Sequence, residues 1–381
     1  MLTQRVEFIP EQDREMFASL PAAAGVFLLR GDDQNAEPYV TKTANLRRRI
    51  ERLLAAPEER TRRLNLRGRV RWLEYSRTGS DFESGLMLYR LLREHFPKTY
   101  AERLRFRFAP LVKFHLENAY PRASVTTRLG RLGGPTLYYG PFSGRPAAEK
   151  FLNDSLDFFK MRRCVEDLQP DPAFPGCIYS EMKMCLAPCF KGCTDEEYGG
   201  EVTRVRNYLD SRGQSLVREM AAEREGAAQN LAFEEAAGIH ARIEKLKPVL
   251  SGLPEIVGRI DRLAGLMVQP SAEANSVALF RIQRGRIAGP QSFLIQPPEH
   301  TKSQSMESRV EACLALALPS EPVSPTETME HLAILKRWFY RSSRLGEIFV
   351  ADEKGQLPMR RVVRGIGRVW RGEKEETGAG S

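Results

Sequence analysis

Three short segments near the start of the chain have the apolar character of β-strands. Gly25–Arg30 is an almost unbroken apolar run, as expected of a strand buried on both faces. Val70–Arg77 places apolar Val70, Trp72 and Tyr75 among polar residues, and residues 38–41 form a third short extended segment. Turn-forming residues separate the first two of these segments along the chain. We therefore predict at least three strands within the first 80 residues.

Two segments between and after these strands have helical spacing instead. Thr43–Ala55 carries apolar residues three and four positions apart, which predicts an amphipathic helix. Ser80 followed by Glu83 is a capping box, and it predicts a helix that runs to about Phe96, before a proline. Together with the strands, these helices predict a small α/β domain of the order β-β-α-β-α.

The rest of the chain changes character several times. Strands are expected over 123–128 and 136–139, two antiparallel helices between about 196 and 249, and a hairpin formed by 276–282 and 290–295. The whole chain is thus predicted as an α/β domain, then a Cys-rich linker region, an α-helical hairpin and an α+β part. The boundaries we assign are 18–100, 101–195, 196–250 and 251–360, followed by a basic, Gly-rich tail over 361–381 that we expect to be disordered.

Charge is distributed unevenly along the 381 residues. The net charge is +9, but residues 1–150 hold 27 Lys and Arg against 17 Asp and Glu, whereas the remainder is nearly neutral. Arg outnumbers Lys 45 to 13, and paired guanidinium donors suit phosphate oxygens. A basic first lobe indicates nucleic-acid binding, although an Arg-rich solvated surface would give the same counts. No apolar run is long enough for a membrane span and no signal peptide is visible, so we expect a cytoplasmic protein.

Five of the six cysteines lie within 30 residues of one another. Their spacing is Cys164-x12-Cys177-x7-Cys185-x3-Cys189, with Cys193 as an additional candidate. In a chain without an export signal, such a cluster indicates metal or cofactor ligands before disulfides. Four thiolates could hold zinc or an iron–sulfur cluster, and simple buried thiols are the third possibility.

Several motifs resemble the UvrC/Cho family of excinuclease subunits, whose first domain is a GIY-YIG nuclease. The motifs that carry this resemblance follow the family's order: Leu20-Pro21 before Gly25-Val26-Phe27, then Tyr39-Val40-Thr41-Lys42 with Arg49, Tyr139-Gly140-Pro141-Phe142, the cysteine loop, and Leu231-Ala232-Phe233-Glu234 of a UVR motif. The resemblance covers about residues 18–250 and continues more weakly to about 351. It implies a GIY-YIG-like small mixed sheet with helices.

The resemblance also indicates which nuclease positions are kept. Matching residues are Tyr39, Lys42 and Arg49, a remnant of the catalytic site. The departures from the family pattern are Phe27 for a tyrosine, Thr41 for a glycine, Leu53 for a further tyrosine and Leu88 for the metal-binding glutamate. A leucine cannot bind a metal ion, and Glu83 and Glu94 point more than 100° away from Leu88 around a helix. We therefore expect no hydrolysis by the family mechanism, and a role for Mg²⁺ or Mn²⁺ only if the site is active.

The cationic residues of this domain would still bind a phosphate backbone. The candidates for DNA contact are Lys42, Arg47, Arg48, Arg49 and Arg52. An exposed helix face would present the same arginines without binding anything.

The resemblance implies a cofactor and a protein partner as well. For Cys164, Cys177, Cys185 and Cys189 it implies a [4Fe–4S] cluster, with zinc as the alternative. For the UVR hairpin it implies docking to a UvrB-like helicase through Leu231, Phe233, Glu234, Ala236 and Ala237, while a plain structural hairpin is the other interpretation.

Full-length UvrC proteins continue into an RNase H-like nuclease and helix-hairpin-helix motifs, which we do not find in this sequence. The expected function is therefore a UvrC-like DNA-binding protein related to nucleotide excision repair that lacks nuclease activity. The alternative is an active Cho-like endonuclease that makes a single metal-dependent incision in damaged DNA.

Overall fold

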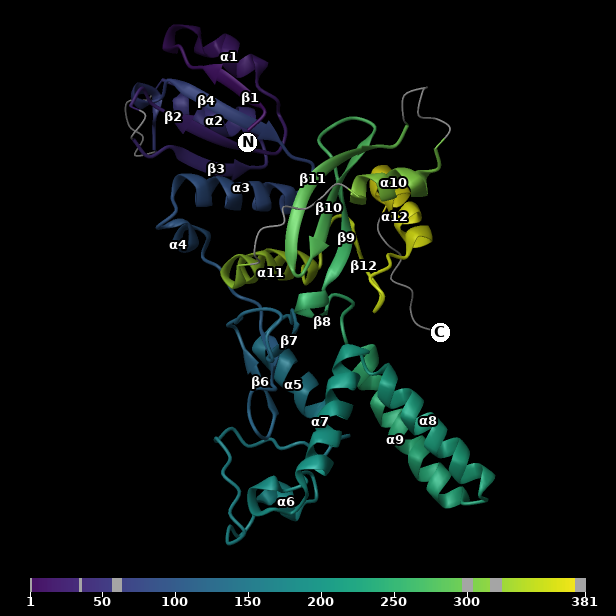
Figure 1. Cartoon of the computed structure of the whole chain (residues 1–381). Helices are drawn as coiled ribbons and strands as arrows, with labels where there is room; N and C mark the ends of the chain where they lie inside the picture. The colour runs from purple at the N-terminus through teal and green to yellow at the C-terminus, as the bar shows by residue number, and fades with distance from the viewer. Residues whose placement is uncertain (1, 34–35, 57–63, 297–303, 316–323, 374–381) are drawn as a thin grey trace.

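The computed structural model describes residues 2–33, 36–56, 64–296, 304–315 and 324–373. Within them the strands form three antiparallel sheets of four strands each, and helices pack around these sheets (Figure 1). The expected α/β class is confirmed in this general form. No helix in the described ranges is long and apolar enough to cross a membrane.

The N-terminal sheet has the strand order β1-β4-β2-β3. Its elements are β1 (Gln4–Glu7), η1 (Pro10–Gln12), α1 (Asp13–Ser19), β2 (Gly25–Arg30), β3 (Tyr39–Thr43), α2 (Leu46–Leu54), η2 (Arg67–Arg69) and β4 (Trp72–Arg77). The predicted order β-β-α-β-α is confirmed, and β1 was not predicted. The apolar face of α2 is buried against the sheet through Leu46, Ile50, Leu53 and Leu54, next to Phe27 of β2.

Two helices follow this sheet, namely α3 (Asp81–His95) and α4 (Tyr100–Leu104). The Ser80 hydroxyl accepts a hydrogen bond from the Glu83 backbone N–H at 3.1 Å, so the predicted N-cap is confirmed. The Glu83 carboxylate instead accepts from the Gly79 N–H at 2.8 Å, one residue before the N-cap. These two bonds fix the point at which the chain leaves β4 and begins α3.

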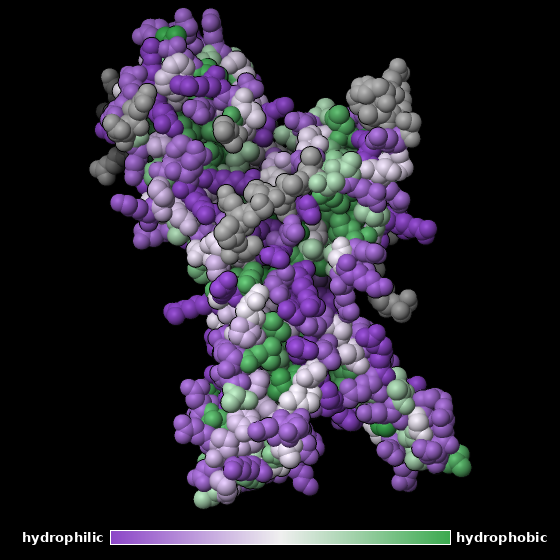
Figure 2. Space-filling model, viewed as in Figure 1, coloured by the Kyte–Doolittle hydropathy of each residue, from purple (hydrophilic) through white to green (hydrophobic). Residues whose placement is uncertain are grey.

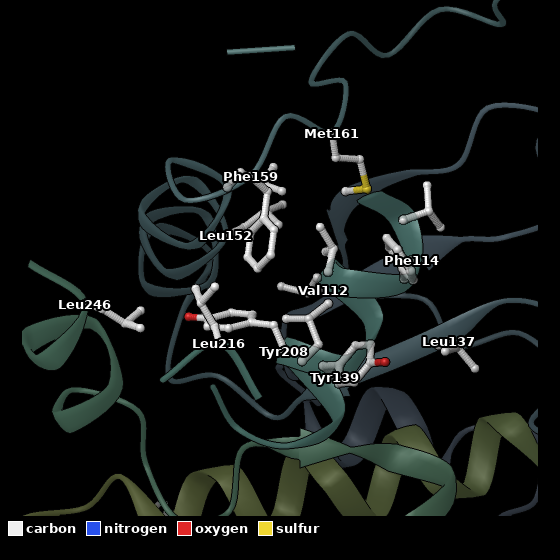
Figure 3. Packing of buried hydrophobic residues seen from close by; sticks show 14 of the residues in the cluster. Val112, Phe114, Leu137, Tyr139, Leu152, Phe159, Met161, Tyr208, Leu216 and Leu246 are labelled. Carbon is white, nitrogen blue, oxygen red and sulfur yellow. The ribbon is translucent and has the colours of Figure 1, made fainter. Parts of the chain in front are cut away.

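The middle sheet combines strands that are far apart in the sequence. Its order is β6-β5-β7-β8, and the last strand comes from beyond residue 250. The elements are β5 (Leu111–His115), β6 (Arg122–Thr126), β7 (Leu137–Gly140), α5 (Arg145–Leu156) and β8 (Gly258–Arg259). Figure 3 shows the core beneath this sheet, where Val112 and Tyr139 lie near Leu152, Phe159 and Tyr208.

The cysteine loop joins α5 to the helical region. It is irregular except for α6 (Ile178–Glu181) and η3 (Pro188–Phe190). Three helices follow, not the two that we predicted over 196–249: α7 (Asp195–Asp210), α8 (Gln214–Gln229) and α9 (Phe233–Ser251). The helices are interrupted at Gly213, where φ is 88°, and again at Leu231, where φ is 60°. Helices α8 and α9 form the hairpin that projects from the rest of the molecule at the lower right of Figure 1.

The C-terminal sheet has the order β11-β10-β9-β12. Its elements are η4 (Ile260–Arg262), β9 (Ala264–Pro270), β10 (Ser276–Gln283), β11 (Arg286–Leu294), α10 (Met306–Ala315), α11 (Pro325–Phe339), β12 (Glu347–Val350) and α12 (Met359–Arg371). The predicted hairpin is present as β10 and β11, and β9 was not predicted.

The disorder expected over 361–381 is wrong for residues up to Arg371, which belong to α12; residues 374–381 lie outside the described ranges. Val362, Ile366 and Val369 recur at helical spacing and are buried against the sheet. Gly365 is in the middle of this helix because a Cβ there would overlap the Phe349 ring. Arg368 also binds the buried Glu347 carboxylate with two nitrogens, at 2.8 and 2.6 Å. Packing and this ion pair therefore hold α12 in place.

One hydrophobic core joins α3, the helix that follows the N-terminal sheet, to the C-terminal sheet. Phe82, Leu86 and Tyr89 of α3 belong to the same buried cluster as Phe280 of β10 and Trp338 of α11. The helix that follows the N-terminal sheet thus packs on the C-terminal one.

Candidate functional site

The remnant catalytic residues lie on β3 and α2 of the N-terminal domain. The Arg49 guanidinium donates to the Tyr39 hydroxyl at 2.9 Å. The Phe27 ring lies 6.1 Å from the Tyr39 ring, and its side chain is wholly buried. Thr41 pairs with Phe27 across the two strands, and Leu53 is in the core below. Tyr39 and Arg49 therefore meet, and neither Phe27 nor Leu53 beside them offers the hydroxyl that the family's tyrosines would supply.

Lys42 lies at the same place but is already paired. Its ammonium contacts the carboxylate of Asp81, the first residue of α3. The other oxygen of Asp81 accepts from the Arg341 guanidinium at 2.8 Å, so one carboxylate bridges two cations. Burial alone would raise the pKa of Asp81, but the hydrogen bonds and charges of Lys42 and Arg341 hold it below its usual value. Asp81 is thus an ionised partner of Lys42.

Sequence reasoning missed Asp81, although a signal was present. Asp81 precedes Leu88 by seven residues, and seven steps of about 100° bring two helical residues to nearly the same face. Both residues line one cleft, together with Lys42. A carboxylate therefore does reach this region, but from two turns before the expected position and already bound by cations.

The cleft has a volume of about 700 Å³ and is lined by residues of both α3 and α11. Its described lining residues include one carboxylate, Asp81, and many cations. Besides Lys42 and Arg341 these are Arg105, Arg107, Lys336, Arg337 and Arg344. The site is therefore strongly electropositive.

The arginines of α2 differ in what they contact. Arg47 donates to the carbonyl oxygens of Leu20 and Ala18, at 2.7 and 2.9 Å, and so holds the end of α1. Arg48 and Arg52 are exposed on the helix surface. Arg47, Arg48 and Arg52 are all exposed, but the Arg47 guanidinium is engaged with backbone carbonyls. The half-buried Arg49 is bound to Tyr39.

The four cysteines with the expected spacing lie close enough to influence one another. Burial, and then the neighbouring thiols Cys164, Cys189 and Cys177, raise the pKa of Cys185 to about 11. Burial, and then the charges of Glu197, Asp195 and Cys189, raise the pKa of Cys193. Backbone N–H of Ala187 donates to the Cys185 sulfur at 3.3 Å. Even so, no three His, Cys, Asp or Glu side chains in the described ranges converge as a ready-made metal site.

Arg162 gives this loop a buried positive charge. Its side chain is wholly buried, and its guanidinium donates to the Cys164 sulfur at 3.3 Å and to the carbonyls of Tyr120 and Glu166 at 2.9 and 2.8 Å. Within the described part of the chain no carboxylate forms an ion pair with it. A buried charge is normally paired, so the donor set and Arg162 fit a group that makes the thiols anionic.

The expected partner-binding residues lie at the free end of the α8–α9 hairpin. Leu231 and Phe233 are 73% and 65% exposed, whereas Leu216, Ile243 and Leu246 hold the two helices together. Hydrophobic atoms are visible at this tip in Figure 2, at the lower right. Glu234 and Ala237 are exposed beside them, and Ala236 is half-buried.

Comparison with known proteins agrees with this arrangement. A family model described as the UvrC/Cho excinuclease middle domain matches residues 110–208, which include strands β5, β6 and β7 of the middle sheet, the cysteine loop and most of α7. This part of the chain is therefore similar to the middle domain of the UvrC/Cho excinucleases. No solved structure gives a significant match.

Curated relatives named UvrABC system protein C are similar over most of this chain. That of Dehalococcoides mccartyi is 25% identical over 293 residues, covering 76% of this chain and 47% of the relative. Those of Carboxydothermus hydrogenoformans and Rickettsia bellii are 27% and 26% identical, covering 72% and 82% of this chain and 44% and 48% of the relatives. The chain is thus UvrC/Cho-like, and it spans about half the length of the curated relatives it matches.

Proposed function

We propose that this UvrC/Cho-like protein binds DNA in a process related to nucleotide excision repair and does not cut it by the family mechanism. The observation that carries the proposal is the cleft beside Lys42. Leu88 stands where the metal-binding carboxylate is expected, and Asp81 is bound by Lys42 and Arg341. A divalent cation there would have to displace two cations to reach one carboxylate. The exposed arginines of α2 are free to contact phosphates.

The test is a cleavage and binding assay with the unmodified protein. Damaged and undamaged duplexes are incubated with Mg²⁺ or Mn²⁺, and the products are separated by electrophoresis under native and denaturing conditions. We expect shifted complexes at low salt and no nicked strand. Nicking that requires the metal and is lost in Arg49→Ala would overturn the proposal, because a contaminating nuclease would be indifferent to that substitution.

An active Cho-like endonuclease is the second candidate, and Asp81 is the observation in its favour. Its carboxylate lies on the same face of α3 as Leu88 and beside Lys42, so among the described residues that line the cleft it is the acidic group that a metal could recruit. This candidate requires that Asp81→Asn abolish metal-dependent nicking while DNA binding persists.

We further propose that Cys164, Cys177, Cys185 and Cys189 hold a [4Fe–4S] cluster, with zinc as the alternative. Arg162 supports an anionic thiolate-bound group, since it is buried without a carboxylate partner. Hydrogen bonds to sulfur and charge near the cluster are the means by which proteins stabilise such groups.

Protein purified without oxygen should absorb broadly in the visible range and contain iron. Cys185→Ser should remove the colour, whereas Cys193→Ser is the matched control and should keep it. A colourless protein with stoichiometric zinc would decide for zinc, and a protein with neither metal would refute the site.

The hairpin tip is proposed as the contact for a UvrB-like partner. Exposed Leu231 and Phe233 provide apolar area that two thin helices cannot bury by themselves. Leu231→Glu with Phe233→Glu should abolish binding to such a partner without lowering the melting temperature, because both side chains are in solvent. Glu235→Ala, exposed on the same tip, is the control.

A further inference from the structure

Gln269 is a buried polar side chain whose hydrogen-bonding groups are unused. It belongs to β9, its side chain is 0% exposed, and it lines the cleft between α3 and α11. Within the described residues, neither the amide nitrogen Nε2 nor the amide oxygen Oε1 has a hydrogen-bond partner. Buried polar groups in native proteins are almost always satisfied, so this amide indicates that something supplies both an acceptor and a donor.

The cleft beside Gln269 has the size and walls of a small-molecule site. Its volume of about 700 Å³ lies within the usual range for ligand pockets. Tyr89, Phe106 and Trp338 line it together with Leu88, so an aromatic ring would find flat apolar partners there.

The cations of the cleft are of two kinds. Lys42 and Arg341 are neutralised by Asp81. Arg105, Arg107 and Arg337 also line the cleft, and no carboxylate in the described ranges forms an ion pair with them. Three arginines without acidic partners at one site favour an anion with several oxygens, such as phosphate.

We propose that this cleft binds a nucleotide: the Gln269 amide, which is fully covered in this structure, turns to meet the base edge, and the unpaired arginines hold the phosphate. A glutamine amide presents a donor beside an acceptor, which is the pattern that reads adenine through N6 and N7. Adenine nucleotides are therefore the expected class. The site goes beyond the proposed DNA contacts on α2, because it is built from α3, β9 and α11 and reads a base.

The nucleotide has two possible sources with the same chemistry. It can be a free mononucleotide, or one nucleotide of a single strand whose base enters the cleft. Calorimetric titration of the full-length protein with dAMP, dGMP, dCMP and dTMP tests the first source. Titration with a short single strand, with and without one abasic position, tests the second.

We expect dAMP, or the strand with its base intact, to bind best. Gln269→Leu keeps the volume of the side chain and removes both unsatisfied groups, so the protein should melt at an equal or higher temperature. It should nevertheless bind adenine about 5- to 150-fold more weakly, the equivalent of the 1–3 kcal/mol of a bidentate amide–base pair. Arg337→Ala, an exposed position, should weaken binding of every nucleotide alike.

The controls separate this site from the proposed DNA surface. Arg48→Ala with Arg52→Ala should leave dAMP binding unchanged, as should Arg218→Ala on the distant hairpin. Absence of mononucleotide binding together with equal affinities for the intact and the abasic strand, or affinities unaffected by both Gln269→Leu and Arg337→Ala, would overturn the proposal without touching DNA binding by α2. Tighter binding of another base would overturn the assignment of adenine to Gln269.

Discussion

Asp81 and Arg341 are 260 residues apart in the chain and form an ion pair of 2.8 Å. Because Asp81 also binds Lys42, a single carboxylate connects the remnant nuclease pocket to the segment that follows α11. Both partners are about half exposed, so the pair contributes little to stability, at most about 1 kcal/mol. Its main effect is to reduce the positive charge that Lys42 and Arg341 would present to the DNA phosphates.

Asp81→Asn should therefore strengthen DNA binding. The substitution releases Lys42 and Arg341 from their shared carboxylate, and each freed cation can neutralise one phosphate. The slope of log affinity against log salt concentration should steepen by up to about 2 units, measured by fluorescence anisotropy at several salt concentrations. Asp154→Asn is the control, since it removes a comparable surface pair with Lys150 on α5. An unchanged slope in Asp81→Asn would place the DNA elsewhere.

The arginines of α2 should separate into contact and structural residues. Arg48→Ala with Arg52→Ala should flatten the salt slope by up to about 2 units and leave the melting temperature unchanged. Arg47→Ala should instead lower the free energy of unfolding by about 1–3 kcal/mol, because its guanidinium holds the carbonyls of Leu20 and Ala18. The opposite division, with Arg47 setting the salt slope, would contradict the geometry of α1 and α2.

Leu88→Glu alone should not create a nuclease. The new carboxylate would enter a cleft lined by cations and would pair with one of them before it could bind Mg²⁺. Position 27 would also still lack the hydroxyl of the family's tyrosine. The variant should show no metal-dependent nicking of supercoiled DNA, and weaker DNA binding than the unmodified protein. Leu88→Gln, without the charge, is the control that isolates the electrostatic part.

Adding Phe27→Tyr and Thr41→Gly to Leu88→Glu is the more demanding test. The Phe27 ring is wholly buried, so a hydroxyl there costs stability unless it finds a partner such as Tyr39. We expect a lower melting temperature and, at most, weak nicking. Efficient cleavage would mean that Tyr39, Lys42 and Arg49 are better arranged for catalysis than their present partners suggest.

His331 should make stability depend on pH. It is buried in α11, its Nδ1 accepts from the Ile287 N–H at 2.9 Å, and burial lowers its pKa to about 4. The histidine takes up a proton near pH 6.5 in the unfolded state but not in the folded state. The stability gained from burying the neutral His331 ring is therefore fully present above pH 6.5. It is lost as the pH falls towards 4, by up to about 3 kcal/mol.

Urea unfolding between pH 4 and 7 measures this slope. His331→Gln retains an acceptor and cannot titrate, so its stability should change less with pH over the same range. Equal slopes for the two proteins would show that His331 is already protonated in the fold, or is exposed in solution.

Local sequence signals were sufficient to predict an element when the residues that define it lie within the element itself. Ser80 caps α3 because its hydroxyl meets an N–H three residues on, and the spacing of Leu46, Ile50 and Leu53 defines the buried face of α2. The edge strand β1 has no apolar period, so nothing local marked it. Disorder was predicted after residue 360 because the segment is rich in charge and glycine. The helical spacing of Val362, Ile366 and Val369 indicated α12 instead.

The site itself depends on contacts that no local pattern contains. Asp81 could have been found from its seven-residue distance to Leu88, but its partner Arg341 could not. Gln269 is an ordinary polar residue in the sequence, and only burial by a distant helix makes its amide exceptional. In the sequence Arg47 cannot be told apart from the arginines beside it. Its structural role follows only from its hydrogen bonds to the carbonyls of Ala18 and Leu20.

The position of α3 has a consequence for how this protein can be divided. Its residues Phe82, Leu86 and Tyr89 are covered by β10 and α11, so a fragment cut near residue 100 would expose them to water. Such a fragment would be prone to aggregate, and limited proteolysis should release no stable N-terminal piece. The nuclease-like part and the distal part are therefore expected to melt together in calorimetry, and an autonomous version of either would first need a new surface for this one helix.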